Sequence, residues 1–218
     1  GTPVVHGEID HVDYLTGVNN YNSNHGHQAM SLMAAQHDDA NVAGIAPDSQ
    51  LWGLNIKTES QDGVGLLEGL KTVATQRQRN ERMVFQGGFQ GDWPWTANGA
   101  TEQDVESALG ASRDWGFFSI AAGNGGPGAP NFTDPNYLNS VSGVAQPERQ
   151  FGHIASVGAL EFTGQDWVDN LLNATGTDLA SYSNRGSNLT LVAPTESWSI
   201  DGDGAVRDFG GTSAANPN

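Results

Sequence analysis

Residues 117–126 read FFSIAAGNGG, a short apolar run followed at once by a glycine-rich polar loop. An apolar run of this length, bounded by glycines, is typical of a strand buried in a sheet. Further buried strands are predicted at 51–56, 82–85, 154–160 and 189–193, and amphipathic helices at 64–78 and 102–115. Short apolar strands that alternate with helices indicate a mostly parallel sheet with helices on both faces. We therefore predict an α/β fold.

The 218 residues are expected to form one domain, because no repeat and no linker-like tract divides them. Residues 1–24 and 125–150 are rich in Gly, Pro, Asn and Asp and are predicted to be surface loops. In parallel sheets of this kind, catalytic and ligand-binding groups lie in the loops at the carboxyl ends of the strands. Asn124 follows the strand predicted at 117–122, so we expect it at that edge.

The loop that contains Asn124 also matches the dinucleotide pattern G-x-G-x-x-G, at residues 123–128. That pattern requires a helix that begins at its third glycine, so that the pyrophosphate meets the helix N-terminus. Here the chain continues as APNFTDPN, with Pro130 and Pro135 and no helical period. The sequence therefore argues against nucleotide binding, and Asn124 is the residue of interest in this loop.

The composition excludes several other classes of protein. The net charge is −16, from 25 acidic and nine basic residues, which argues against binding nucleic acid or an anionic membrane surface. No apolar run approaches the roughly 18 residues that a membrane-spanning helix needs, so we expect no membrane insertion. The absence of Cys excludes thiol nucleophiles and Cys-based zinc sites. An acidic chain of this kind suits an extracellular or high-salt protein or one that binds cations, and the alternative is a merely acidic soluble domain. Among these, we expect a secreted protein.

Ser213 is a candidate nucleophile, because it follows Gly210-Gly211-Thr212. Glycines directly before a Ser allow a sharp turn that leaves the hydroxyl uncovered. The segment SAAN, which starts at Ser213, could begin a helix, whose N-terminal dipole favours a developing negative charge. The esterase pattern G-x-S-x-G does not occur in the chain, which lowers the case for a lipase or esterase.

A Ser nucleophile needs a base, and His25 is the best of the six His residues. His25-Gly26 precedes an apolar segment of good helix formers, which predicts that His25 lies at a helix N-terminus. The alternative is that His25 and His27 form a surface or metal-binding pair. No nearby carboxylate spacing completes a metal site convincingly.

Six segments, taken in chain order, resemble the subtilisin-like serine proteases, the subtilases. HGHQAMSLMAA resembles the family's His block, VAGIAPDSQLWGLNI the segment after it, FFSIAAGNGG the oxyanion block, IASVGAL and LASYSNRGSNLTLVAP the later strands, and GGTSAANP the Ser block. The resemblance covers nearly the whole chain and implies the subtilisin-like α/β fold. The related sedolisins have a Glu and an Asp where this chain has His25 and Asn124.

The resemblance implies a serine endopeptidase that acts on proteins or peptides. Ser213 would attack the carbonyl carbon, and His25 would take its proton and return it to the leaving amine. Asn124 would donate its side-chain N–H to the oxyanion, together with the backbone N–H of Ser213. No cofactor is implied for the reaction.

Substrate binding is expected on two segments. The family's substrate-pairing strand corresponds here to Gln86-Gly87-Gly88-Phe89-Gln90, so Gly88 and Phe89 are candidate substrate-binding residues. The loop 119–124, which contains Ala122 and Gly123, is small and apolar and predicts a preference for apolar side chains.

The chain also departs from the family pattern. The family's H-G-T-H block is His25-Gly26-His27-Gln28 here, and Gly88 stands where the substrate strand usually has a Ser. These departures leave open an alternative, a non-catalytic subtilase-fold module used for binding or as a scaffold.

A subtilase orients its His with an Asp at the end of an apolar strand. Asp10 and Asp13 are the candidates upstream of His25, but polar residues interrupt the apolar run and no glycine follows at the expected place. We therefore expect the Asp-bearing strand to lie before Gly1, and the peptidase domain to be truncated at both ends.

Structural calcium is a further expectation from the family. Acidic loops at 37–41 (HDDAN) and 201–204 (DGDG) are candidate sites. The alternative for each loop is a solvated acidic turn.

Overall fold

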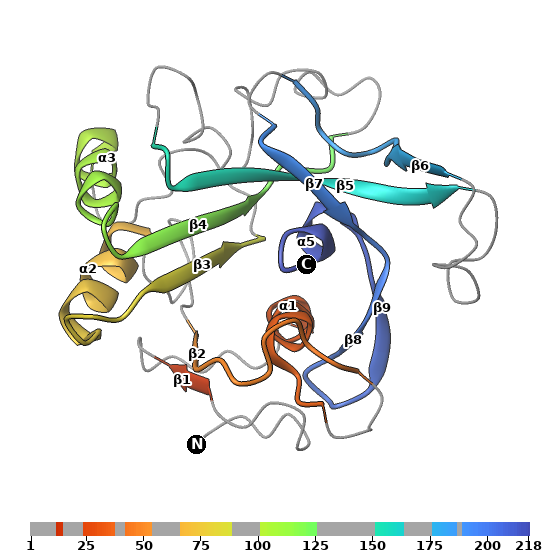
Figure 1. Cartoon of the computed structure of the whole chain (residues 1–218), viewed down its shortest axis with the longest axis horizontal. Helices are drawn as coiled ribbons and strands as arrows, with labels where there is room; N and C mark the ends of the chain where they lie inside the picture. Colours follow the sequence, from red (N-terminus) through yellow and green to blue (C-terminus); the bar gives the residue numbers. More distant parts are fainter. Residues whose placement is uncertain are drawn as a thin grey trace.

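The structure is a computed structural model that describes residues 12–14, 24–37, 42–53, 66–88, 101–125, 151–163, 176–186 and 189–218. Its elements are β1 (Val12–Tyr14), α1 (Asn24–Ala34), β2 (Leu51–Gly53), α2 (Leu66–Gln76), β3 (Met83–Gly87), α3 (Glu102–Ala111), β4 (Gly116–Ala121), β5 (Ile154–Thr163), β6 (Gly176–Leu179), β7 (Leu191–Pro194), β8 (Ser197–Ile200), β9 (Val206–Phe209) and α5 (Gly211–Ala215) (Figure 1).

A mostly parallel sheet forms the centre of the described chain. β3, β4 and β5 are consecutive parallel neighbours, β7 is parallel to β5, and β6 is antiparallel to β5. β1 and β2 form a separate parallel pair, and β8 and β9 form an antiparallel hairpin. The register pairs Gly87 of β3 with Ile120 of β4, so these two strands end close together.

Helices cover both faces of this sheet. Successive residues of a strand face opposite sides, so each face has its own set of apolar side chains that a helix can cover. On one face, Phe118 and Ile120 of β4 and Ile154 of β5 pack against leucines and valines of α2 and α3. On the other face, Val157 and Ala159 of β5 pack with Ala215 of α5. The predicted α/β fold is therefore confirmed (Figure 1).

The helix predicted at 102–115 is shorter than expected. It begins at Glu102, after the N-cap Thr101. The Thr101 side chain accepts a hydrogen bond from the Asp104 amide, and the Asp104 carboxylate accepts one from the Thr101 amide, which forms a capping box. It ends at Ala111, and residues 112–115 form a turn. Ser112 is the reason: it is buried, and its hydroxyl donates to the Leu109 carbonyl and so competes with the helical pattern.

Several other boundaries also differ from the prediction. The surface loop expected over 1–24 contains β1, and α1 already begins at Asn24; 1–11 and 15–23 lie outside the described residues. Parts of three other predicted segments lie outside the described residues as well. They are residues 54–56 of the strand predicted at 51–56, residues 64–65 of the helix predicted at 64–78, and residues 126–150 of the loop predicted at 125–150. The sequence does not predict the strands β6, β8 and β9, because each has only four residues and two of the four are polar. Within the described ranges, none of the helices has the length and apolar character that crossing a membrane requires.

Candidate active site

Two of the predicted site residues directly follow neighbouring parallel strands. Gly88 comes immediately after β3, and Asn124 lies three residues after the end of β4. Because parallel strands end at the same edge of a sheet, both residues are placed at the edge where ligands bind in such folds. The sheet therefore brings together two segments that are more than thirty residues apart in the sequence.

His25, Gly88 and Ser213 meet at one point. A Cβ atom added to Gly88 would lie 3.2 Å from Cε1 of His25 and 3.5 Å from Cβ of Ser213. The Ser213 hydroxyl donates a hydrogen bond to the Gly88 carbonyl at 3.2 Å. In the described part of the chain, the Ser213 hydroxyl is not hydrogen bonded to His25. Hydrogen bonds between catalytic groups are often long or absent before a substrate binds.

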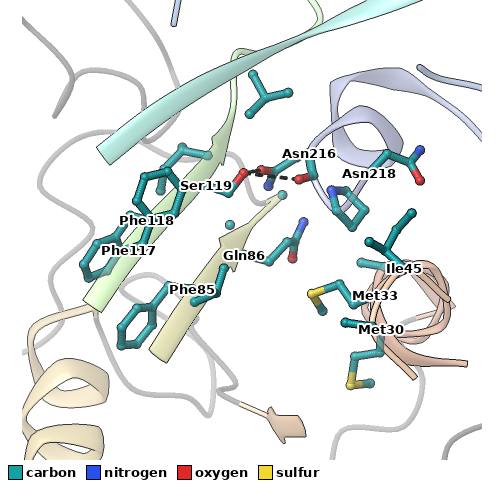
Figure 2. Close-up of a pocket in the computed structure, with 18 of the residues that line it drawn as sticks. Met30, Met33, Ile45, Phe85, Gln86, Phe117, Phe118, Ser119, Asn216 and Asn218 are labelled. Carbon is teal, nitrogen blue, oxygen red and sulfur yellow. Dashed lines mark hydrogen bonds between the residues drawn. The ribbon is translucent and has the colours of Figure 1, made fainter. Parts of the chain in front are cut away.

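Ser213 lies in the short helix α5, next to the end of strand β9. The helix begins at Gly211, two residues earlier than the predicted start at Ser213. Gly211 has φ +77°, a conformation that glycine adopts without steric cost. Below the site, the Ser119 hydroxyl of β4 hydrogen bonds to Asn216, which fixes α5 over the sheet (Figure 2).

Asn124 is held by the residue that precedes Ser213. Its Oδ1 accepts one hydrogen bond from the Thr212 amide and another from the Thr212 hydroxyl, both at 2.9 Å. Since these donors identify the oxygen of the amide, Nδ2 is the other atom, and it lies 3.0 Å from where a Cβ of Gly211 would be. The side chain of Asn124 is exposed.

Ala122 and Gly123 are buried, and their backbone groups are already engaged. Ala122 donates to Val157 and accepts from the Asn184 side chain, while Gly123 donates to the Thr212 hydroxyl and accepts from the Asn184 amide. Their role in substrate binding stays a prediction. Phe89, the other predicted substrate-binding residue, lies outside the described residues.

The imidazole of His25 packs against an aromatic ring that sequence analysis did not single out. Phe209, the last residue of β9, lies edge-to-face with His25, with ring centroids 5.2 Å apart and an interplanar angle of 86°. Partial desolvation lowers the pKa of His25 below its ordinary value of 6.5. The neutral ring, which is the form that can accept a proton, is therefore favoured.

The alternative of a metal-binding His pair does not fit the helix. His25 is exposed, whereas His27 is 4% exposed and buried. Residues two apart in an α-helix do not face each other, which explains this difference. Across the described residues, no group of three or more His, Cys, Asp and Glu side chains is arranged to hold a metal ion.

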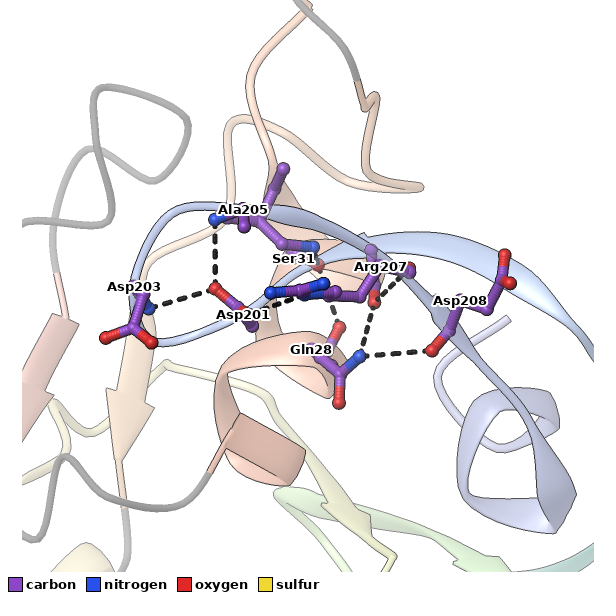
Figure 3. A network of polar contacts seen from close by, with 9 residues as sticks. Gln28, Ser31, Asp201, Asp203, Ala205, Arg207 and Asp208 are labelled. Carbon is purple, nitrogen blue, oxygen red and sulfur yellow. Dashed lines mark hydrogen bonds and ion pairs between the residues drawn. The ribbon is translucent and has the colours of Figure 1, made fainter.

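The acidic loop at 201–204 is the turn of the β8–β9 hairpin, in which Asp201 is buried and Asp203 is exposed. Asp201 is 3% exposed, and its carboxylate accepts hydrogen bonds from the amides of Asp203 and Ala205 and from Nε of Arg207 (Figure 3). These bonds lower the pKa of Asp201, with the Ala205 amide as the largest cause. Of the other candidate calcium loop, residues 38–41 lie outside the described residues, and the His37 ring is hydrogen bonded to the Gly44 carbonyl.

The two candidates for an orienting carboxylate remain predictions. Asp10 lies outside the described residues, and Asp13 lies in β1, where only the backbone is described. Asp13 pairs with Trp52 of β2 in the parallel ladder. Among the side chains that the structure describes, no carboxylate is hydrogen bonded to His25.

A cavity of about 1220 Å³ opens beside His25 and Gly88. Its walls come from α1, β3 and β4, with Met30 and Met33 on one side and Phe117 on the other (Figure 2). Neither Ser213 nor Asn124 is among the described residues that line it. We therefore place the reacting groups by the contacts above and not by this cavity.

Residues 5–218 of the chain match the model of the Subtilase family. The chain belongs to the subtilase family. The resemblance that its motifs suggested is thus confirmed, and with it the assignment to a family of serine proteases. A comparison with curated proteins found no match for this subtilase.

Solved protease structures share the subtilase fold of the chain. The patellamide maturation protease PatA is 22% identical with a TM-score of 0.62, over 100% of this chain and 70% of its own. Sphericase is 19% identical with a TM-score of 0.59, over 100% of this chain and 69% of its own. A mutant protease domain of PatA is 22% identical with a TM-score of 0.59, over 89% of this chain and 61% of its own. This subtilase chain therefore spans about three fifths to seven tenths of the length of these structures.

Proposed function

We propose that the chain provides the catalytic groups of a serine endopeptidase, with Ser213 as nucleophile, His25 as general base and Asn124 as oxyanion donor. The observation that carries the proposal is the meeting of His25 and Ser213 at Gly88, with the Asn124 amide fixed beside them by Thr212. These groups come from four separate segments. Their convergence at the carboxyl edge of the sheet supports a common chemical role.

The proposed reaction begins when a peptide carbonyl takes a position in front of Ser213. The Ser213 hydroxyl turns from the Gly88 carbonyl toward His25, whose neutral ring takes the proton as the oxygen attacks the carbonyl carbon. The carbonyl oxygen becomes an oxyanion, which Nδ2 of Asn124 and the Ser213 amide stabilise. His25 then gives its proton to the leaving amine, and water hydrolyses the acyl-enzyme through the same groups.

Gly88 is proposed to accept the substrate at this site. The lack of a side chain keeps open the space between His25 and Ser213, where a Cβ would lie 3.2 Å from the imidazole. An extended substrate could therefore pass close to both groups. The proposed chemistry uses only side-chain and backbone groups, so we propose that no cofactor takes part. The net charge of −16 supports our further proposal that the protein is secreted.

A fluorophosphonate probe tests the proposal, because it forms a bond only with an activated Ser. We expect labelling of the protein at Ser213, identified by mass spectrometry, and loss of labelling in Ser213→Ala and His25→Ala. Ser112→Ala is the matched control, since Ser112 is a buried hydroxyl at the end of α3, far from the site. Labelling that persists in Ser213→Ala would overturn the assignment of the nucleophile.

The alternative is a non-catalytic module with the same fold. One observation favours it: the Ser213 hydroxyl is bonded to the Gly88 carbonyl and not to His25. Absence of labelling in the unsubstituted protein would support this alternative. Loss of about 10²–10³-fold in labelling rate on Asn124→Ala would argue for the enzyme; that magnitude is the one known for this donor in subtilisin itself.

A further inference from the structure

Asn184 joins both sides of the loop that carries Asn124, although nothing in the sequence pattern drew attention to it. Its Nδ2 donates to the Ala122 carbonyl at 3.1 Å, and its Oδ1 accepts from the Gly125 amide at 2.9 Å. Its own backbone amide donates to the Gly123 carbonyl at 2.9 Å. Asn184 thus contacts the residues before and after Asn124.

Two of the three bonds of Asn184 join buried residues, and the third reaches Gly125, which is half-buried. Asn184 is 1% exposed, and Ala122 is fully buried. A buried amide that loses its partner costs more than the bond itself, because neither group can turn to water instead. The three bonds therefore restrict the loop strongly, and they do so over a separation of about 60 residues in the sequence.

Asn184 is itself fixed to the central sheet. The preceding turn is anchored to β5 by two bonds of Ala159, whose carbonyl accepts from the Ala180 amide at 2.9 Å and whose amide donates to the Ser183 hydroxyl at 3.0 Å. Ala159 is completely buried in the core of that face. Hydrogen bonds therefore connect β5, through Ser183 and Asn184, to the loop at the site.

The loop needs such support, because it lies beyond the regular pairing of β4. β4 ends at Ala121, and Gly123 has φ +98°, a conformation outside the strand region. On the far side of the loop, Thr212 holds the side chain of Asn124 but not the backbone at Gly125. Asn184 supplies the bond that holds Gly125.

We propose that Asn184 is a positioning residue for the oxyanion donor: it fixes the backbone on both sides of Asn124 so that Nδ2 stays directed in front of Ser213. The inference rests on the proposed function. Asn184 does not touch the reacting atoms, and it acts only through the loop 122–125. Its effect should therefore be on the step in which negative charge develops, with little effect on initial binding of a substrate or probe.

Two substitutions separate the bonds of Asn184. Asn184→Ala removes both side-chain bonds, while Asn184→Asp keeps an acceptor for the Gly125 amide but sets a carboxylate oxygen against the Ala122 carbonyl. With a fluorophosphonate we expect the limiting rate of labelling to fall about 10- to 100-fold in Asn184→Ala and at least as much in Asn184→Asp, because a buried carboxylate repels the Ala122 carbonyl. The affinity for the probe should change less than about threefold in either variant. Ser112→Ala, the loss of a buried hydroxyl at a distance, should leave both constants unchanged.

A second measurement does not depend on activity. Amide hydrogen exchange followed by NMR should show strong protection of Gly125 in the unsubstituted chain and in Ser112→Ala. Protection at Gly125 should be lost in Asn184→Ala and retained in Asn184→Asp, and the side-chain NH₂ resonances of Asn124 should shift in both Asn184 variants.

The two measurements distinguish failure of this inference from failure of the proposed function. If the unsubstituted chain is labelled and Asn184→Ala is labelled at the same limiting rate, the positioning role is wrong while the enzyme stands. If the unsubstituted chain is not labelled, the proposed function fails. The positioning role is then tested only by hydrogen exchange at the Gly125 amide and by the NMR resonances of the Asn124 side chain. Unchanged Gly125 protection and unchanged Asn124 resonances in Asn184→Ala would overturn it in either case.

Discussion

The amide and the hydroxyl of Thr212 converge on one oxygen atom, Oδ1 of Asn124, each at 2.9 Å. The hydroxyl also accepts the Gly123 amide at 3.1 Å, so it links the loop after β4 to the residue before Ser213. Thr212 is 1% exposed. The orientation of the Asn124 amide is therefore set from the same segment that carries the proposed nucleophile.

Thr212→Val should weaken the proposed oxyanion site without removing the donor itself. The substitution keeps the shape of the side chain but loses the hydroxyl, which leaves the buried Gly123 amide without its acceptor. We expect the limiting rate of fluorophosphonate labelling to fall roughly tenfold, as for the loss of one hydrogen bond. Thr212→Ser restores the hydroxyl and should restore the rate. Equal rates in the Val and Ser variants would contradict this role.

Gly211 and Gly210 form a matched pair for testing the turn before Ser213. A Cβ at Gly211, where φ is +77°, would lie 3.0 Å from Nδ2 of Asn124. Gly210 has φ −120°, and a Cβ there would meet nothing within 4 Å. We expect Gly211→Ala to lower the free energy of unfolding by about 1–2 kcal/mol and to displace the Asn124 amide. Gly210→Ala should be close to neutral in urea denaturation, and a similar loss in both variants would refute the argument.

The strands that place the site could be predicted from the sequence because they are continuous apolar runs. They are less buried than such runs predict, since Val84 of β3 is 71% exposed and Phe117 of β4 is 43% exposed. FFSIAA and RMVF were recognised in this way, and they place Asn124 and Gly88 at one edge of the sheet. His25 and Ser213 were found by their glycine contexts. In each case a local pattern carries the information.

The remaining contacts at the site depend on tertiary structure and leave no local pattern. Phe209 ends a short strand in which three of four residues are exposed, so nothing marks it as the neighbour of His25. Asn184 lies in a polar turn, where an Asn is common in any case. Its partners are about 60 residues away, and only the parallel pairing of β4 and β5 brings them within reach.

Asp201 should make the hairpin sensitive to acid. Its folded-state pKa is lowered from 3.8, chiefly by the Ala205 amide, so the unfolded chain binds the proton more readily. The stabilisation is therefore present above pH 3.8 and is lost as the pH falls through the lower folded-state pKa. We expect the free energy of unfolding of the wild type to decline in this range and that of Asp201→Asn to decline less.

Asp203→Asn is the control for Asp201, because Asp203 lies in the same turn but is exposed. Chemical denaturation at a series of pH values between about 2 and 6 measures both variants. An acid decline that is the same in Asp201→Asn and in the wild type would show that the turn is not stabilised by the Asp201 charge. The turn matters for the site, because β9 leads from it to Phe209.

Phe209→Leu should raise the pKa of His25. Desolvation lowers this pKa from 6.5, and the Phe209 ring, 5.2 Å from the imidazole, is part of what excludes water. Leu keeps apolar contact with the buried Ala29, Leu32 and Ala214 but is too small to cover the imidazole. An NMR titration of the His25 ring protons should therefore show a midpoint below 6.5 in the wild type and a higher midpoint in the variant.

The same substitution predicts a shift in activity. A proton on His25 prevents it from acting as a base, so the labelling rate should fall at acid pH with the midpoint of the His25 titration. Phe209→Leu should move this acid limb to higher pH, whereas Phe118→Leu, which removes a buried ring from the opposite face of the sheet, should not. If both variants moved the limb equally, or neither moved the NMR midpoint, Phe209 would have no specific influence on the protonation of His25.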